Sequence, residues 1–220
     1  MDYEGPTADD LDNVRALNRC FLELYSGSGA PGCGGLGSRR LPEAELKRLS
    51  AAPFLLFSFH ESDGELWGRV LGDDPQLDLC STAGPRDMRL RELTATALSF
   101  IWQLSRRNPF AARVISGAPV TWCLQLANVT LMTLAKCVAG RADMLVPRFH
   151  DRDDVWRRLL GSGVSARRQL QLMSHQSAMQ FMLTRQHKGH ERLAAAACRF
   201  GGPKHRVADT REEELADSAV

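Results

Sequence analysis

Apolar residues recur every three or four positions along most of this chain, and this spacing constrains the fold more than any other sequence feature. One such stripe predicts a helix over residues 9–25, and another predicts a helix that ends at Asn108-Pro109. A short apolar run at residues 54–59 is typical of a strand or a buried extended segment. The pattern therefore predicts a mainly α fold, a multi-helix bundle with at most one short strand pair in the N-terminal part.

Turn and capping residues place further helices along the chain. Pro42 and Pro53 bound a short second helix, and Gly140 is placed to end a central one. Ser165 is placed to cap a long helix that reaches about residue 186. The remaining predicted helices cover residues 110–116, 119–139, 151–160 and 191–200.

The segment from residue 114 to 135 carries no charged side chain, and its length would suffice to span a bilayer. Gly117 and Pro119 interrupt it, however, and Gln125 and Asn128 add polar groups. These residues favour a helix buried on nearly all sides of a globular fold over a membrane span. We therefore expect no membrane partner.

The net charge of +2 conceals a change of sign along the chain. Residues 1–80 hold 7 basic and 14 acidic side chains, whereas residues 81–200 hold 18 basic and 7 acidic ones. We place a domain boundary near residue 84, because a stretch rich in Asp, Pro and Gly separates the two parts. The expected organisation is an acidic N-terminal helical domain (1–84), a basic helical domain (86–200) and a disordered tail (201–220). The basic part either meets an anionic partner or neutralises the acidic part, within one chain or between subunits.

Six cysteines are scattered through the chain, and no two of them form a CxxC pair. Cys123 and Cys137 fall in an apolar helical stretch, where a free thiol behaves as a small hydrophobic group. The start of the chain is polar and acidic, unlike a signal peptide. We therefore expect a cytoplasmic protein in a reducing compartment.

Arginines gather on both sides of the Gly161-Ser162-Gly163 turn. Helix, glycine turn, serine cap and helix form the outline of a helix-turn-helix unit, whose side chains contact phosphates and base edges. The candidate DNA-binding residues are Arg157, Arg158, Arg167, Arg168, Gln169 and Gln171, with His175 beside them. Further arginines flank the helix before Asn108: Arg86, Arg89, Arg91, Arg106 and Arg107. An αα-hairpin with a solvated arginine face has the same sequence pattern, so both interpretations remain open.

Residues with metal-binding or catalytic chemistry are present, but they form no recognised pattern. His187 and His190 lie one helical turn apart without completing a ligand set. The aspartates at positions 151, 153 and 154 suit the N-terminus of a helix. The loop at residues 27–38 contains the letters GxGxxG, but a helix precedes it where a dinucleotide site needs a strand. We therefore predict no metal ligand, cofactor or catalytic residue.

Several short motifs in the first part of the chain follow one another in a particular order. They are LNRCFLEL at 17–24, LG at 36–37, LPEAELKRL at 41–49, FLLFSF at 54–59 and ESDGELW at 61–67. In this order, residues 11–71 resemble the D subunit of the enterobacterial flagellar master transcriptional regulator. The resemblance implies a helical, dimerising subunit that acts with a protein partner to activate transcription. This chain is much longer than that subunit, and its basic second part has no counterpart there.

The function that we expect is a bacterial transcription-regulator subunit without catalytic activity. Its basic part would contact DNA, and the subunit would form a homo-oligomer. We assign the contact with a protein partner to Phe21, Leu24, Phe57 and Trp67.

Two other functions remain open. A helical adaptor that binds only protein would suit the apolar residues Trp67, Trp102, Met179 and Met182. An enzyme with a dispersed site would bring together His150, Asp153 and His175 in one pocket.

Overall fold

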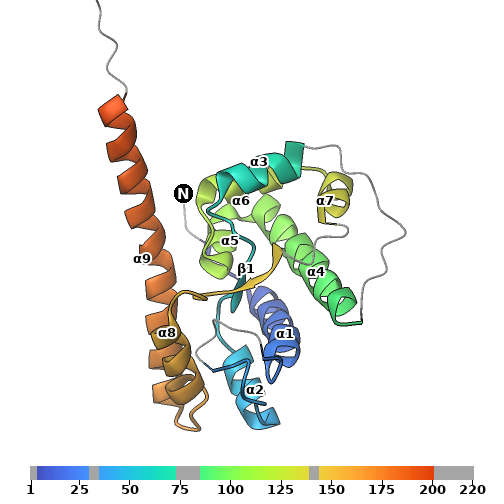
Figure 1. The fold of residues 1–220 in the computed structure, drawn as a ribbon, viewed down its shortest axis with the longest axis vertical. Coiled ribbons are helices and arrows are strands. Elements are labelled where there is room, and N and C mark those ends of the chain that lie inside the picture. Colours follow the sequence, from blue (N-terminus) through green and yellow to red (C-terminus); the bar gives the residue numbers. More distant parts are fainter. Residues whose placement is uncertain (1–3, 30–34, 73–84, 139–143, 201–220) are drawn as a thin grey trace, which may run out of the picture. The chain divides into compact units, whose positions relative to one another are not determined.

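The computed structural model describes residues 4–29, 35–72, 85–138 and 144–200, with side chains in these ranges except at 85–87, 137–138 and 185–200. The chain divides into two compact units, Met1–Gln186 and His187–Val220. The described part of the first unit is mainly α with one two-stranded sheet, which confirms the predicted fold class (Figure 1). The predicted tail at 201–220 lies outside the described residues.

The first helix, α1 (Ala8–Tyr25), begins at a capping box. The Thr7 hydroxyl accepts a hydrogen bond from the Asp10 N–H at 3.2 Å, and the Asp10 carboxylate accepts one from the Thr7 N–H at 2.9 Å. Val14 and Phe21, on the predicted apolar stripe, are inaccessible to solvent. The local capping signal and the buried stripe together explain why this segment is helical.

The segment after α1 forms α2 (Glu43–Ser50), β1 (Phe57–Ser58) and α3 (Gly64–Gly72). Helix α2 packs against α1. The chain that follows α2 is held by Asn18, a buried residue of α1. Its side-chain amide donates a hydrogen bond to the Phe54 carbonyl and accepts one from the Leu56 N–H, both at 2.8 Å.

Four helices follow: α4 (Pro85–Arg107), α5 (Pro109–Ser116), α6 (Val120–Asn128) and α7 (Leu131–Val138). The last three of these helices all contact α4 (Figure 1). Asn108 caps α5, because its side-chain oxygen accepts a hydrogen bond from the Ala111 N–H at 3.0 Å. Gly117 ends α5 in the left-handed conformation, with φ of 66°.

The prediction of one continuous central helix over residues 119–139 was wrong, because the structure has the two helices α6 and α7 there. Val129 between them is extended, with φ of −82° and ψ of 146°. Thr130 then caps α7, since its hydroxyl accepts a hydrogen bond from the Thr133 N–H at 3.1 Å. Among the described residues, no helix is long and apolar enough to cross a bilayer.

The short sheet joins distant parts of the chain. Strand β2 (Val146–Pro147) pairs antiparallel with β1, so that Phe57 lies opposite Pro147 and Ser58 opposite Val146. The strand expected at 54–59 thus finds its partner beyond residue 84. Aromatic rings in the core connect the same parts of the chain. The centroid of the Phe21 ring lies 5.3 Å from that of the Phe57 ring and 6.4 Å from that of the Trp156 ring.

A buried ion pair follows β2. The Arg148 Nε donates a hydrogen bond to the Leu55 carbonyl at 2.7 Å, and its Nη2 donates to the Phe57 carbonyl and to the Glu61 carboxylate, the latter at 3.2 Å. Burial lowers the pKa of Arg148, and the Glu61 charge opposes this shift. Buried side chains from both sides of residue 84 belong to one hydrophobic cluster, so the charge boundary there does not coincide with a boundary of this core.

The last elements are α8 (Asp153–Arg158), a π-helical turn η2 (Leu159–Gly163) and α9 (Arg168–Phe200). Ser165 was predicted to cap α9, but the helix begins only at Arg168, and the Ser165 hydroxyl accepts a hydrogen bond from the Arg167 N–H at 3.1 Å in the turn before it. Helix α9 is continuous where the sequence predicts two helices, one to about 186 and one over 191–200.

Candidate functional site

The residues predicted to bind DNA all lie on the hairpin of α8, η2 and α9. Helix α8 lies beside the first turns of α9 (Figure 1), and the Ser174 hydroxyl donates a hydrogen bond to the Arg158 carbonyl at 3.2 Å. The backbone of Gly163 packs closely against Ser174 and His175, where a Cβ would come within 3.3 Å and 3.4 Å of their side-chain atoms. The widened π turn therefore brings the two helices into direct contact.

Two hydrogen bonds fix the tip of this hairpin to α2. The Arg48 guanidinium donates to the Val164 carbonyl at 3.2 Å, and the Gln171 amide donates to the Arg48 carbonyl at 2.8 Å. Gln171 was predicted to contact DNA, but in this structure its amide nitrogen is occupied by this contact within the protein.

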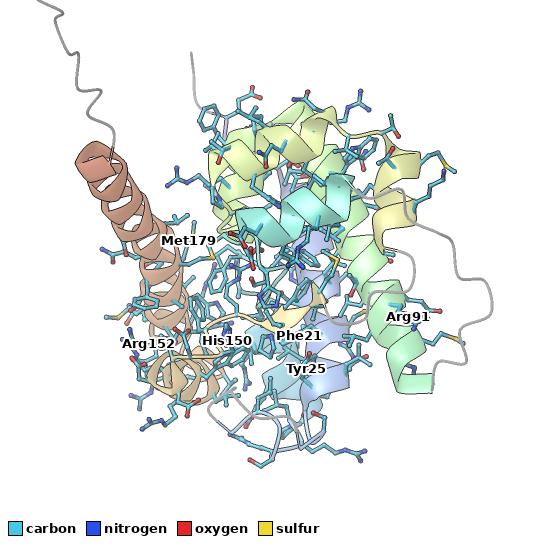
Figure 2. All side chains as sticks on the ribbon, turned by 45° about the horizontal axis from the view of Figure 1, so that its top comes forward. Phe21, Tyr25, Arg91, His150, Arg152 and Met179 are labelled. Atoms are coloured by element: carbon cyan, nitrogen blue, oxygen red, sulfur yellow. The ribbon has the colours of Figure 1, made fainter. Side chains whose placement is uncertain are left out.

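The side of the hairpin is held by aromatic and charged groups. Arg152 lies next to this hairpin (Figure 2). Its guanidinium lies 4.7 Å from the centre of the Phe181 ring and also donates a hydrogen bond to the Asp154 carboxylate at 2.9 Å. The hydrogen bond and charge of Arg152 hold the pKa of Asp154 at about 2. Asp154 also pairs with Arg158 at 3.3 Å, so this predicted DNA-binding arginine already has an anionic partner.

Three of the four predicted arginines have no such partner. Arg157, Arg167 and Arg168 are exposed, and within the described residues none of them forms an ion pair. Arg15 of α1 and Arg39 of the loop after it contrast with them, because each of these exposed arginines lies 2.6 Å from a carboxylate oxygen. The hairpin therefore presents uncompensated positive charge.

The position of Arg167 and Arg168 at the start of α9 is unusual for helix stability. The N-terminus of a helix carries partial positive charge and favours acidic residues. The first turn of α9 nevertheless contains no acidic residue. The partial positive charge of the helix N-terminus and the two guanidinium groups together favour an anion such as a phosphate group.

His175, which the sequence placed beside the DNA-binding residues, lies on the inner face of the hairpin. It is 3% exposed, and its Nε2 faces the Gly163 backbone without a hydrogen bond of normal geometry among the described residues. Burial lowers the pKa of His175 to about 4, against a smaller opposing effect of the Gly163 backbone. The imidazole is therefore neutral at pH 7 and belongs to the packing of the hairpin.

The other arginines predicted near α4 are partly engaged. The Arg106 guanidinium lies 5.0 Å from the centre of the Trp102 ring, and Arg107 pairs with Asp10 at 2.6 Å. The side chain of Arg86 lies outside the described residues.

The residues assigned to a protein partner are mostly interior. Phe21, Phe57 and Trp67 are at most 1% exposed, and Leu24 is partly buried against the same core. The side chains of Phe21, Phe57 and Trp67 therefore contribute to the core and not to the surface of the described chain. Met182 is likewise buried, while Trp102 and Met179 are partly buried.

The residues proposed for a dispersed enzyme site do not share an environment, because His150 and Asp153 are exposed whereas His175 is buried. No group of three or more metal-binding side chains gathers among the described residues. The side chains of His187 and His190 lie outside them.

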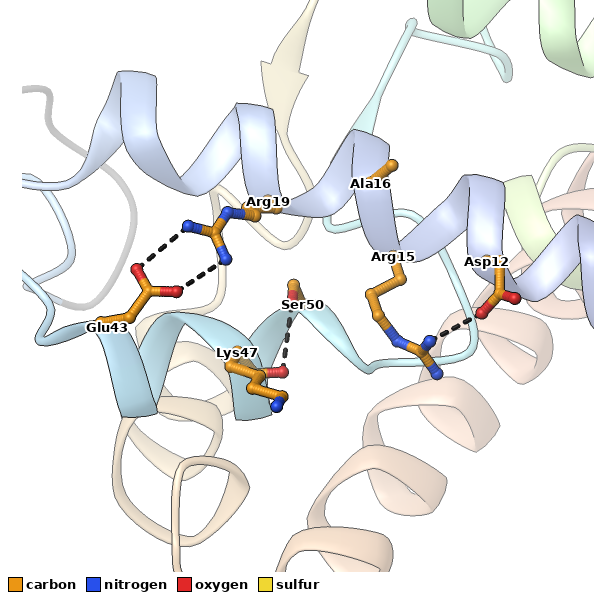
Figure 3. A pocket seen from close by; sticks show the side chains of 7 residues that line it. All are labelled: Asp12, Arg15, Ala16, Arg19, Glu43, Lys47 and Ser50. Carbon is orange, nitrogen blue, oxygen red and sulfur yellow. Dashed lines mark hydrogen bonds and ion pairs between the residues drawn. The ribbon is translucent and has the colours of Figure 1, made fainter.

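An open groove lies between α1 and α2 (Figure 3). Both of its arginines are already balanced within the groove, because Arg15 pairs with Asp12 at 2.6 Å and Arg19 pairs with Glu43 at 2.7 Å, and only Lys47 of its lining cations forms no ion pair among the described residues. The groove therefore offers less free charge to a ligand than the hairpin does.

Comparison with protein-family models, curated proteins and solved structures gave no match for this chain. The resemblance of residues 11–71 to the D subunit of the flagellar regulator therefore stays a prediction.

Proposed function

We propose that this protein binds DNA through the α8–α9 hairpin and acts as a subunit of a bacterial transcription regulator. The observation that carries the proposal is the exposed, unpaired state of Arg157, Arg167 and Arg168 in the described part of the chain. Arginine guanidinium groups suit phosphate oxygens, because they donate two parallel hydrogen bonds and keep their charge. The role in transcription comes from the sequence resemblance at residues 11–71.

The structure of the hairpin supports a phosphate-contacting role. The contacts of Arg48 with Val164 and of Gln171 with Arg48 fix the tip of the hairpin, so the arginines project from an anchored backbone. An anchored site loses less conformational entropy when it binds a ligand than a mobile one does. The N-terminus of α9 adds its own partial positive charge at the same place.

The proposal is tested by replacing the three unpaired arginines together, as Arg157→Ala, Arg167→Ala and Arg168→Ala. We expect weaker binding to mixed-sequence duplex DNA in fluorescence anisotropy. The slope of log K against log salt should decrease in magnitude by about 3, because each phosphate contact contributes roughly 0.9.

A matched control replaces Arg15, Arg19 and Arg39 by alanine. Arg15 and Arg39 are also exposed and Arg19 is partly exposed, but each of the three is paired with a carboxylate, and the change in net charge is the same. The control should retain most of the affinity and the salt slope. An equal loss of binding in both variants would show that only net charge matters, which contradicts a site on the hairpin.

A further inference from the structure

The solvent-facing side of α9 carries no charge over more than four helical turns. Residues 169–184 include no Asp, Glu, Lys or Arg. Ser174, His175, Ala178 and Met182 of this segment are buried and define the inner face of the helix. An exposed helix face in a globular protein is usually rich in charged residues, so this face is an exception.

The centre of the outer face is formed by glutamines around one methionine. Gln169, Met173, Gln176 and Gln180 are exposed and follow one another at spacings of four, three and four residues, which places them in one row. Met173 is 66% exposed, and Leu170 and Leu172 on either side of the row are 41% and 47% exposed.

Side chains of these types match the edges of A·T base pairs in the major groove. A glutamine amide can donate to N7 and accept from N6 of adenine in a paired contact, and apolar groups contact the thymine methyl group.

The row also has a suitable length. At a rise of about 1.5 Å per residue it spans roughly 16 Å from Gln169 to Gln180, which is about five base pairs. The unpaired arginines at the start of α9 would lie at one end of the row, where they could contact phosphates.

We infer that the outer face of α9 reads base edges in the DNA major groove, with a preference for A·T-rich sequences. Gln169, Gln176 and Gln180 make the base contacts, and Met173 packs against thymine methyl groups. This inference rests on the proposed function, in which the arginines of the hairpin supply the phosphate contacts. The proposed function and this inference predict different measurements, because phosphate contacts determine overall affinity and base contacts determine sequence preference.

The test compares the full chain with a variant carrying Gln169→Ala, Gln176→Ala and Gln180→Ala. Both proteins are measured against an A·T-rich and a G·C-rich duplex of equal length at one salt concentration. The unaltered chain should prefer the A·T-rich duplex, and the preference should fall roughly tenfold for each amide that makes a base contact. Alanine retains the helix, so the variant should still bind mixed-sequence DNA with the same salt slope.

A control with Gln103→Ala and Gln125→Ala removes exposed glutamines from α4 and α6 and should leave the preference unchanged. Equal affinity of the unaltered chain for the two duplexes would overturn the inference while leaving the proposed function in place. The same would follow if the triple glutamine variant kept the full preference. An unaltered chain that binds neither duplex would overturn both, and the exposed Leu170, Leu172 and Met173 would then indicate a protein-binding face.

Discussion

At the scale of single residues, two buried polar side chains connect segments that are far apart in the sequence. Asn18 of α1 binds the backbone of residues 50–56, and Arg148 binds backbone carbonyls of residues 55–57. Each has hydrogen-bond partners that match its own donors and acceptors. Such residues fix one arrangement of the chain, because a displaced segment would leave a buried polar group without a partner.

Replacing Asn18 by aspartate should destabilise the fold strongly. The new side chain has nearly the same shape, but its carboxylate would face the Phe54 carbonyl at 2.8 Å and the carbonyls of Ser50 and Ala52 at 3.4 Å. We expect the free energy of unfolding in urea to fall by about 3 kcal/mol or more, because a buried charge would lack a donor for one of its oxygens. The exposed Asn13→Asp on the same helix is the control. A loss below about 1 kcal/mol for Asn18→Asp would contradict this account.

Gly117 should tolerate no side chain. Its φ is 66°, and a Cβ would lie 2.6 Å from Met182 atoms and 2.9 Å from Nη1 of Arg148. Gly117→Ala should therefore cost about 2–4 kcal/mol in urea unfolding, through backbone strain and displacement of the neighbours. Gly68→Ala in α3 meets nothing within 4 Å and should be neutral or slightly stabilising. Similar effects of the two substitutions would show that Gly117 is not in this close environment.

At the scale of elements, the hairpin of α8, η2 and α9 should make stability depend on pH. The folded chain keeps His175 neutral down to about pH 4, whereas the ordinary pKa of the unfolded residue is 6.5. Protonation between these values therefore favours the unfolded chain. The contribution of His175 to the free energy of unfolding should be fully present above pH 6.5. About 3 kcal/mol should be lost as the pH falls to 4.

The measurement is urea unfolding of the unaltered chain and of His175→Leu between pH 7 and pH 4.5. The contributions of all other groups are shared by both proteins, so they cancel in the difference. The difference in the free energy of unfolding between the two proteins should change with pH, because the unaltered chain loses more stability than His175→Leu as the pH falls. Parallel curves would mean that His175 titrates normally in the folded chain.

Elements defined by local patterns could be predicted from the sequence, whereas those defined by distant contacts could not. The apolar stripe of α1 and the proline at the start of α5 are local signals, and both helices are found. The partner of β1 is β2, nearly ninety positions away, and no local pattern specifies that pairing. The break at Val129 was missed because its neighbours keep the helical spacing of apolar residues.

In the candidate site, too, local features could be predicted from the sequence and distant contacts could not. The arginines on both sides of the glycine turn could be predicted because their position relative to the turn is a local property. That Gln171 contacts Arg48, and that Arg158 pairs with Asp154, depends on packing and became visible only in the structure. Gln176 and Gln180 were not selected from the sequence, although their spacing from Gln169 is a signal that could have indicated one helix face.

At the scale of the whole molecule, the acidic and basic parts of the sequence compensate each other only in part. Arg107 pairs with Asp10 across the charge boundary, and Arg148 pairs with Glu61 in the core. Other arginines near α1 and α2 pair with carboxylates close by. Arg157, Arg167 and Arg168 of the hairpin form no ion pair among the described residues, which favours an external anionic partner.

The most direct test of this account is the binding of the full chain to mixed-sequence duplex DNA, measured by fluorescence anisotropy across a salt series. We predict binding at low salt that weakens steeply as salt increases, with log K falling linearly against log salt and a slope of about −3 or steeper. Such a slope would indicate three or more phosphate contacts. No binding at low salt, or an affinity independent of salt, would contradict the central claim that the hairpin binds the DNA backbone.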